Sequence, residues 1–328
     1  MMGRGPWQDW RERAMQPAEP TLAALPNPVF RYFLATRPAF LTVTLFACMV
    51  GLGAAYFDGI ALSPAKASAT LLFALMAHAG INVLNDYYDE LNGTDRLNTD
   101  RVFPFTGGSR FIQNGVLTAR KTRVFGAGLL AIVVAAGLWL TSVSAPGLIW
   151  IGAGGLFVGW GYSAPPFALN SRGLGEPCVA VGFALIVVGT DFVQRSTYAL
   201  LPVVVAVSYA LLVMNILFIN QFPDRRADEA AGKRHWVVIL GPRRARWGYA
   251  AIGAAAYGFL LWAGGAGFLP RLSLIALASA VLTAIAARDL LRHADQPQLL
   301  APAIKLTIGA ATLHGLLLAG ALFMAGRG

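Results

Sequence analysis

The sequence predicts an all-α membrane protein in which nine transmembrane helices form one bundle. Of the 328 residues, 56% are hydrophobic and 13% are charged, whereas a soluble domain carries about 25% charged residues. Nine apolar stretches also approach the roughly 20 residues that a helix needs to cross a bilayer. The predicted spans are residues 38–57, 67–84, 122–141, 146–162, 176–193, 198–219, 247–268, 272–291 and 301–325.

The basic residues divide unevenly between the connections. If the N-terminus lies in the cytoplasm, 22 of the 26 Lys and Arg residues fall in the N-terminal tail or in cytoplasmic connections. Lys66, Arg195, Arg271 and Arg327 fall on the other side. The positive-inside rule therefore predicts a cytoplasmic N-terminus and a periplasmic or extracellular C-terminus in the cell (inner) membrane. Topology then explains the net charge of +10, and we expect no nucleic-acid partner.

The chain is predicted to consist of a cytoplasmic N-terminal tail, residues 1–30, and one transmembrane domain, residues 31–328. The tail lacks the apolar segment of a signal peptide. Most connections between spans are short, but residues 85–121 and 220–246 are long and polar. Long polar connections in an otherwise compact bundle are usually functional.

Half of the sixteen acidic residues lie in two segments, residues 86–100 and 224–229, each at the end of an apolar stretch. They belong to the strings NVLNDYYDELNGTD and NQFPDRRADEAAGKR, which both begin with the pattern Asn-x-x-x-Asp. The second and sixth spans carry these strings, so spans 1–4 and 5–8 are predicted to form two four-helix pseudo-repeats whose acidic segments meet at one membrane face. Because carboxylates are costly at a bilayer boundary, we expect a functional site there.

The spacing of these acids suits a metal site. Asp86 and Asp89 share a helix face with Asn82, and Asp224 and Asp228 are four residues apart. Mg²⁺ prefers hard oxygen ligands and usually combines a few carboxylates with water and phosphate oxygens. We therefore predict two Mg²⁺ ions bridged by a substrate diphosphate, with the four aspartates catalytic. The predicted metal ligands are Asn82, Asp86, Asp89, Asp224 and Asp228.

Further polar residues at the same face are predicted to bind the substrates. The cations Arg110, Lys233 and Arg234 could hold the diphosphate, although each could instead be a positive-inside anchor. Residues 162–176 could contact substrate or merely close a loop. Gly107-Gly108 would allow a close approach of the backbone, but a plain turn is expected. The predicted substrate-binding residues are Asn82, Asn85, Asp95, Arg110, Tyr162, Ser163, Arg172, Asn220, Lys233 and Arg234.

One proline and three polar residues within the spans carry separate expectations. Pro223 predicts a kink or a restart of the sixth span, because proline cannot continue helical hydrogen bonding, and a restart would direct free backbone N–H groups toward the site. His78 and His314 are expected to hydrogen-bond to neighbouring helices rather than to bind metal. Asp191 is expected at the opposite membrane face, as an interfacial acid or paired with Arg195.

Several of these strings resemble a known family. Asn82-x-x-Asn85-Asp86-x-x-Asp89, the following Gly93-Thr94-Asp95, and Asp224-x-x-x-Asp228 with Ala231-Gly232-Lys233-Arg234 resemble the UbiA superfamily of intramembrane aromatic prenyltransferases. The strings NGTD, TGGSR, YSAPPF, RGLGE, GTDFVQ and AAGKR look most like the 1,4-dihydroxy-2-naphthoate polyprenyltransferases of menaquinone biosynthesis. Asp191, where that branch usually has an aromatic residue, and the string NQFPDRRAD depart from the branch and leave the acceptor open.

The resemblance implies a helical bundle around a central cavity that is open to membrane lipid. It also implies Mg²⁺-dependent transfer of an isoprenyl group from a polyprenyl diphosphate to an aromatic acceptor, for which 1,4-dihydroxy-2-naphthoate is the first candidate. Alternative acceptors are 4-hydroxybenzoate, homogentisate, a chlorophyllide or haem ring, and a phosphoribose. A secondary transporter, or a non-catalytic lipid-binding or scaffold protein of the same fold, is a further alternative.

Overall fold

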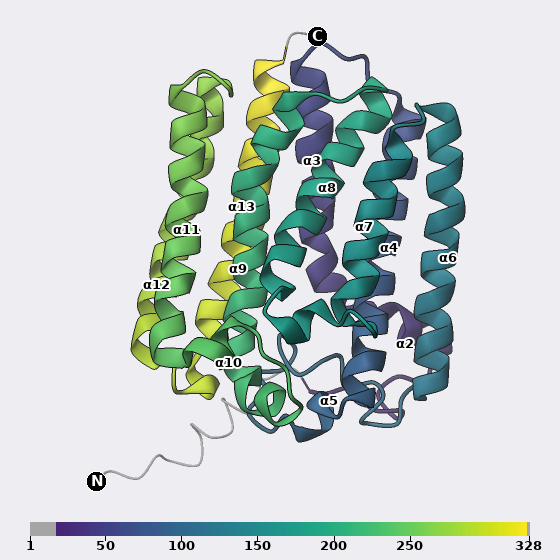
Figure 1. Ribbon diagram of the computed structural model, residues 1–328, viewed down its shortest axis with the longest axis vertical. Helices are drawn as coiled ribbons and strands as arrows, with labels where there is room; N and C mark the ends of the chain where they lie inside the picture. Colours follow the sequence, from purple (N-terminus) through teal and green to yellow (C-terminus); the bar gives the residue numbers. More distant parts are fainter. Residues whose placement is uncertain (1–17, 327–328) are drawn as a thin grey trace.

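The computed structural model describes residues 18–326, which form helices, turns and loops without a strand. Residues 1–17 of the predicted tail, and Arg327, lie outside this range. Figure 1 shows the long helices side by side in one bundle, with the short helices α2, α5 and α10 at its lower end. The helices are α2 (Pro28–Ala35), α3 (Pro38–Phe57), α4 (Pro64–Leu91), α5 (Thr94–Leu97), α6 (Ala119–Val143), α7 (Leu148–Ser163), α8 (Gly175–Arg195), α9 (Leu200–Ala230), α10 (Trp236–Leu240), α11 (Pro242–Gly265), α12 (Ala280–His293) and α13 (Ala301–Ala325), with 3-10 helices η1 (Leu169–Arg172), η2 (Arg271–Ser279) and η3 (Pro297–Leu299).

Within the described range, seven helical stretches are long and apolar enough to cross a membrane. They are α3, α4, α6, α8, α9, α13 and the continuous stretch of η2 with α12. α7 is apolar but has only 16 residues, and α11 begins with three arginines among its first five residues. The prediction of an all-helical membrane protein is therefore confirmed, whereas the count of nine spans and the pseudo-repeats stay predictions.

The two helices that carry the acidic segments are the longest of the bundle. α4 has 28 residues and begins at Pro64, after Ser63, whose side chain accepts a hydrogen bond from the Lys66 N–H. This start combines an N-cap serine with a proline at the first helical position. α9 has 31 residues. Both helices extend beyond their apolar stretches, so their last turns hold carboxylates at the lower end of the bundle (Figure 1).

α9 continues through Pro223 to Ala230 without interruption. The predicted restart of the helix at Pro223 is therefore wrong, and free N–H groups of a new helix start do not reach the site there. A proline inside a helix removes one backbone hydrogen bond and strains the preceding turn. Phe222 and Pro223 are both buried, so tertiary packing holds the helix together at this position.

α9 is also the centre of the bundle, since 67% of its apolar window is buried, against 17% for the peripheral α6. Its Tyr209 is fully buried and donates a hydrogen bond to the Val43 carbonyl of α3 at 2.5 Å. Close approach between other helices depends on small residues. A Cβ atom at Gly51 of α3 would clash with the backbone carbonyl of Val187 in α8.

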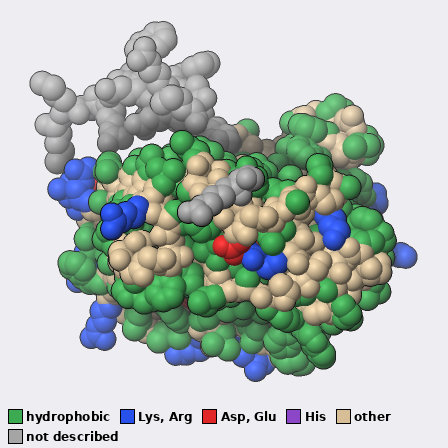
Figure 2. All heavy atoms as spheres, turned by 90° about the horizontal axis from the view of Figure 1, so that it is seen from above, with side chains coloured by type: hydrophobic (Ala, Val, Ile, Leu, Met, Phe, Trp, Pro, Cys, Tyr) green, Lys and Arg blue, Asp and Glu red, His purple; other side chains and the backbone are tan. Residues whose placement is uncertain are grey.

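The opposite end of the bundle has few acidic side chains, and Figure 2 shows a face that is mostly hydrophobic or uncharged. Asp191, in the last turn of α8, is 1% exposed. Its two oxygens accept hydrogen bonds from Arg195 at 2.8 Å and 2.8 Å, and Arg195 Nη2 is also 2.7 Å from Asp58 Oδ2. The expected pairing with Arg195 is confirmed, and the ion pair joins α8 to the end of α3.

Gly51→Ala should lower the stability of the protein, because the added methyl group forces α3 away from α8. Overpacking of this kind costs about 1–3 kcal/mol. Gly128→Ala in α6 is the matched control, since a Cβ atom there has nothing within 4 Å. Thermal unfolding in detergent should show a lower midpoint for Gly51→Ala only. Equal midpoints for the two variants would contradict the described packing of α3 on α8.

Candidate active site

Lys233 joins the two acidic segments. Its Nζ lies 2.7 Å from Asp89 Oδ1 at the end of α4 and 3.1 Å from Asp228 Oδ1 at the end of α9. Lys233 is only 7% exposed. Burial alone would lower the pKa of Lys233, but the carboxylates of Asp89 and Asp228 raise it above its usual value, so the ammonium stays charged. The predicted convergence of the two segments at one end of the bundle is thus observed (Figure 1).

The loop between α5 and α6 also binds both acidic segments. Asn98 Nδ2 donates to Asp224 Oδ1 at 2.5 Å, and the Gly107 N–H donates to Asp224 Oδ2 at 3.3 Å. Two residues later the Ser109 N–H donates to Asp86 Oδ1 at 3.3 Å. One short stretch of loop therefore holds a carboxylate from each of the two helices.

The paired glycines of this loop do more than form the expected plain turn. Gly107 and Gly108 both have φ of +74°, a conformation that side chains with a Cβ atom rarely adopt. A Cβ atom at Gly108 would in addition clash with the Asp95 carboxylate. Glycine is required here because the backbone itself approaches the acidic cluster.

Arg37 supplies a second cation, which the sequence interpretation missed. It precedes Pro38 at the start of α3, has φ of +57°, and forms an ion pair with Asp86. Burial lowers the pKa of Arg37, but Asp86, Asp95 and Asp89 together raise it. A positive φ at a residue other than glycine is strained and is often found at functional sites.

Asp95, on the short helix α5, is a further buried carboxylate beside the acidic segments. It is 2% exposed, and its pKa is raised well above the usual value by burial and then by Asp89 and Asp86. Its environment therefore disfavours a further negative charge and would favour an added cation.

The acidic cluster fits a bound divalent ion only in part. Among residues 18–326, no three His, Cys, Asp or Glu side chains are grouped closely enough to hold a metal ion alone. Mg²⁺ rarely needs such a group, because it keeps water molecules and takes one or two carboxylates together with phosphate oxygens. The hard oxygen donors of Asp86, Asp89, Asp224 and Asp228 match that requirement.

The segment after α9 is held by Asp228 of α9, by the loop that follows α7 and by the first turn of α8. His235 Nε2 lies 3.1 Å from Asp228 Oδ2. The Trp236 N–H donates to Glu176 Oε1 at 3.1 Å, and its ring Nε1 donates to the Gly173 carbonyl at 2.8 Å. Gly173 and Glu176, at the end of the region Tyr162–Glu176, therefore fix the position of the segment that carries Lys233.

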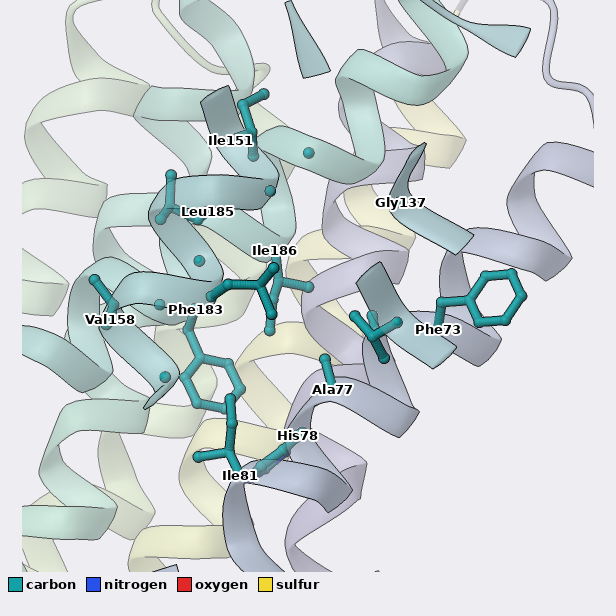
Figure 3. Close-up of a pocket in the computed structure, with 18 of the residues that line it drawn as sticks. Phe73, Ala77, His78, Ile81, Gly137, Ile151, Val158, Phe183, Leu185 and Ile186 are labelled. Atoms are coloured by element: carbon teal, nitrogen blue, oxygen red, sulfur yellow. The ribbon is translucent and has the colours of Figure 1, made fainter. Parts of the chain in front are cut away.

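A cavity of about 550 Å³ lies inside the bundle, and Arg37, which pairs with Asp86, is one of its lining residues. Apolar residues of α3, α4, α6, α7, α8 and α9 form most of its wall, as Figure 3 shows for Ile81, Phe183 and Ile186. Polar side chains at its acidic end are Arg37, Asn82, Asn85, Tyr162 and Asn220. Arg37 therefore belongs both to the cavity wall and to the acidic cluster, so the mostly apolar cavity lies next to the charged site.

Two of the predicted amides are held by specific contacts at this end of the cavity. Asn85 Nδ2 donates to Ser163 Oγ at 2.9 Å, and Asn82 Nδ2 donates to the Thr36 carbonyl at 3.1 Å. The structure therefore brings together Asn82, Asn85, Asp86, Asp89, Asp95, Tyr162, Ser163, Asn220, Asp224, Asp228 and Lys233.

Three predicted cations do not point at the carboxylates. Arg110 donates to the backbone carbonyl of Asp95, and its Nε is 3.7 Å from Glu19 Oε2. Arg172 is exposed and donates to the Pro166 carbonyl of its own loop at 2.7 Å. Arg234 is exposed, and its backbone N–H, rather than its side chain, contacts the Ser171 carbonyl at 3.0 Å. Their roles in substrate binding stay predictions.

Among the residues that contact the aspartates, the sequence interpretation did not single out Arg37, Asn98, Ser109 and His235. Two of them had a usable signal. His235 directly follows the AAGKR string, and Ser109 lies within TGGSR. Arg37 had none, because an arginine just before a span is the ordinary positive-inside pattern.

Comparison with known proteins gives matches over most of the chain. The 1,4-dihydroxy-2-naphthoate octaprenyltransferase of Mycobacterium leprae is 33% identical over 190 residues, 57% of this chain and 62% of that protein, so the chain matches less than two thirds of that relative's length. The protein of the same name from Mycobacterium tuberculosis is 33% identical over 223 residues, 67% of this chain and 73% of that protein. The structure of a UbiA homolog from Archaeoglobus fulgidus bound to GPP and Mg²⁺ has a TM-score of 0.66 at 18% identity, covering 90% of this chain and 99% of that one.

The family model described as the UbiA prenyltransferase family matches residues 44–324, a range that contains both acidic segments, Lys233 and most of the cavity-lining residues. The chain therefore belongs to the UbiA prenyltransferase family.

Proposed function

We propose that this protein transfers an isoprenyl group from a polyprenyl diphosphate to an aromatic acceptor, 1,4-dihydroxy-2-naphthoate, with Mg²⁺ as cofactor. The observation that carries the proposal is the junction between the acidic cluster and the apolar cavity. A polyprenyl diphosphate has the same division into a charged head and a long hydrocarbon tail. The cluster suits the head with its metal ions, and the cavity of about 550 Å³ suits the part of the tail nearest to it.

Asp86, Asp89, Asp224 and Asp228 would hold Mg²⁺, with Asn82 as a further oxygen donor. Bound Mg²⁺ supplies neutralisation of the departing diphosphate. Two ions, one for each acidic segment, would let the diphosphate bridge the segments. Two structures of UbiA homologs from Archaeoglobus fulgidus, one bound to DMAPP and Mg²⁺ and one bound to GPP and Mg²⁺, support this assignment.

The protein's own residues then have two tasks during transfer. Lys233 and Arg37 can exchange their carboxylate partners for diphosphate oxygens, since both lie within the cluster. The apolar wall excludes water from the allylic carbon, which becomes carbocation-like as its bond to the diphosphate oxygen breaks. A ring carbon of the acceptor forms the new carbon–carbon bond, and 1,4-dihydroxy-2-naphthoate releases its carboxylate as CO₂.

Two relatives support 1,4-dihydroxy-2-naphthoate as the acceptor. The proteins of Mycobacterium tuberculosis and Escherichia coli called 1,4-dihydroxy-2-naphthoate octaprenyltransferase are 33% and 30% identical to this chain. The same site could serve 4-hydroxybenzoate, homogentisate, a chlorophyllide or haem ring, or a phosphoribose. A secondary transporter is disfavoured because transporter sites lie near the bilayer midplane, whereas these carboxylates lie in the last turns of α4 and α9.

Asp86→Ala and Asp224→Ala should each lower turnover by about 100-fold or more, because each removes a carboxylate from the metal and diphosphate site. The double variant should be hardly worse than either single variant, since groups that act as a unit lose function non-additively. Asp100→Ala is the control, because among residues 18–326 the ion-pair partner of Asp100 is the exposed Arg226, at 3.3 Å. Steady-state kinetics in detergent would check this. Multiplying effects, or full activity in EDTA, would contradict the shared site.

Lys233→Ala should raise KM for the isoprenyl diphosphate and lower the unfolding temperature of the unliganded protein, because it leaves Asp89 and Asp228 buried without their shared cation. Mg²⁺ should then raise the unfolding temperature of Lys233→Ala more than that of the wild type, since the ion replaces the missing charge. Lys121→Ala, at an exposed position in α6, is the control. An equal response of Lys233→Ala and wild type to Mg²⁺ would place the metal elsewhere.

The proposed topology has nine spans and a cytoplasmic acidic end. A reporter that is active only outside the cytoplasm should work when fused after Gly328 and fail when fused after Gly115 or Gly241. The expectation follows from the uneven distribution of Lys and Arg. The opposite pattern would place the acidic end outside the cytoplasm.

A further inference from the structure

A histidine stands in the apolar wall of the cavity. His78 and Asn82 are four residues apart on α4, so they lie on the same helix face one turn apart. Both residues line the cavity. Figure 3 shows His78 beside Ile81 at the lower end of the labelled wall, with Phe183 next to them.

Two neighbours fix the imidazole ring. Thr44 Oγ1 of α3 lies 2.7 Å from His78 Nδ1, and Thr44 is fully buried. The Phe183 ring stands edge-on to the imidazole, with 5.5 Å between centroids and an interplanar angle of 88°. The ring therefore has one orientation before any ligand enters.

The same contacts determine which nitrogen is free. Within residues 18–326 the Thr44 hydroxyl has no other hydrogen-bond partner than His78, so hydrogen-bond satisfaction assigns it as the donor to Nδ1. Nε2 then carries the ring hydrogen, and the hydrogen bond that the ring forms with the same residues uses Nδ1 and leaves Nε2 without a partner among them. An oriented N–H donor is thus available in a chamber whose wall is mostly apolar.

An isoprenoid tail cannot use this N–H donor, because a hydrocarbon forms no hydrogen bonds. An electron-rich aromatic acceptor can use it. The oxygen substituents of the acceptor lose their bound water on entering the cavity and need a new hydrogen-bond partner. The acceptor ring must lie next to the allylic carbon, close to Asn82 and the acidic cluster. His78 lies one helical turn from Asn82 along α4, about 5.4 Å away. A substituent on the far side of the acceptor ring would therefore meet His78.

We propose that His78 binds an oxygen substituent of the aromatic acceptor through Nε2–H and so selects hydroxylated rings. The inference rests on the proposed prenyl transfer and extends it by naming a residue that recognises the acceptor. Thr44 is a positioning residue in this arrangement, because it acts only by fixing the tautomer and the orientation of His78.

The test compares 1,4-dihydroxy-2-naphthoate as substrate with 1-hydroxy-2-naphthoate and 4-hydroxy-2-naphthoate as competitive inhibitors. Each inhibitor lacks one ring hydroxyl. The wild type should bind the diol about tenfold more tightly than the analogue that lacks the hydroxyl contacted by His78, the usual effect of one hydrogen bond. In His78→Leu, the diol and the analogue that lacks this hydroxyl should bind with equal affinity. The difference in affinity between the diol and the other analogue should stay as in the wild type. KM for the isoprenyl diphosphate should not change.

Further variants separate recognition from packing. His78→Gln keeps an N–H donor and should retain part of the discrimination at an unfolding temperature similar to that of His78→Leu. Thr44→Val should reduce the discrimination because it frees the ring, whereas Thr42→Val should not, since Thr42 hydrogen-bonds within its own helix to Ala39 at 2.8 Å. If His78→Leu weakens the diol and both analogues equally, or raises KM for the diphosphate, His78 only holds α3 to α4 and the proposal is wrong.

Failure of the proposed function would look different. If the wild type prenylates another phenol instead of 1,4-dihydroxy-2-naphthoate, the acceptor assignment fails, and the same comparison is made between that phenol and its deoxy analogue. If the wild type prenylates no phenol, both the function and the role of His78 are contradicted.

Discussion

The ammonium of Lys233, held between Asp89 and Asp228, is the interaction on which the site depends. Two helices cannot bring their carboxylates together in a buried place without a cation, because like charges repel strongly when water is excluded. Lys233 supplies this cation between α4 and α9, and Arg37 supplies a cation to Asp86. Burial raises the pKa of Asp95, and Asp89 and Asp86 raise it further, so an additional cation would be favoured there. The site is therefore organised before its ligands arrive and still attracts positive charge.

Much of the surrounding fold can be understood as support for this cluster. The central position of α9 fixes Asp224 and Asp228, and the loop from Asn98 to Ser109 ties a carboxylate of each helix to one backbone segment. Gly173 and Glu176 accept hydrogen bonds from Trp236 and so hold the segment that carries Lys233. Residues at the lower end of the bundle thus restrict how far the two acidic helices can separate, while the cavity above them stays open for an apolar chain.

The sequence was sufficient for the helical class and for the meeting of the acidic segments, because both depend on simple regularities. Apolar runs of membrane length and an Asn-x-x-x-Asp pattern at the ends of two such runs identify α4 and α9 and their common direction. Contacts made by loops could not be derived in this way. Gly107 and Ser109 reach the aspartates only through the path of the backbone, and Arg110 lies one residue away yet points to Asp95 and Glu19 instead. Pro223 misled the interpretation because local propensity gave way to packing within the bundle.

Binding of an unreactive substrate analogue tests the central claim most directly. Isothermal titration calorimetry with geranylgeranyl S-thiolodiphosphate would measure its affinity with and without Mg²⁺, for the wild type and for Asp89→Asn and Asp228→Asn. If the two helices hold one metal–diphosphate site, tight binding requires Mg²⁺ and is lost in both variants. Tight binding without Mg²⁺, or binding that survives the change on one helix but not on the other, would contradict a site shared by α4 and α9.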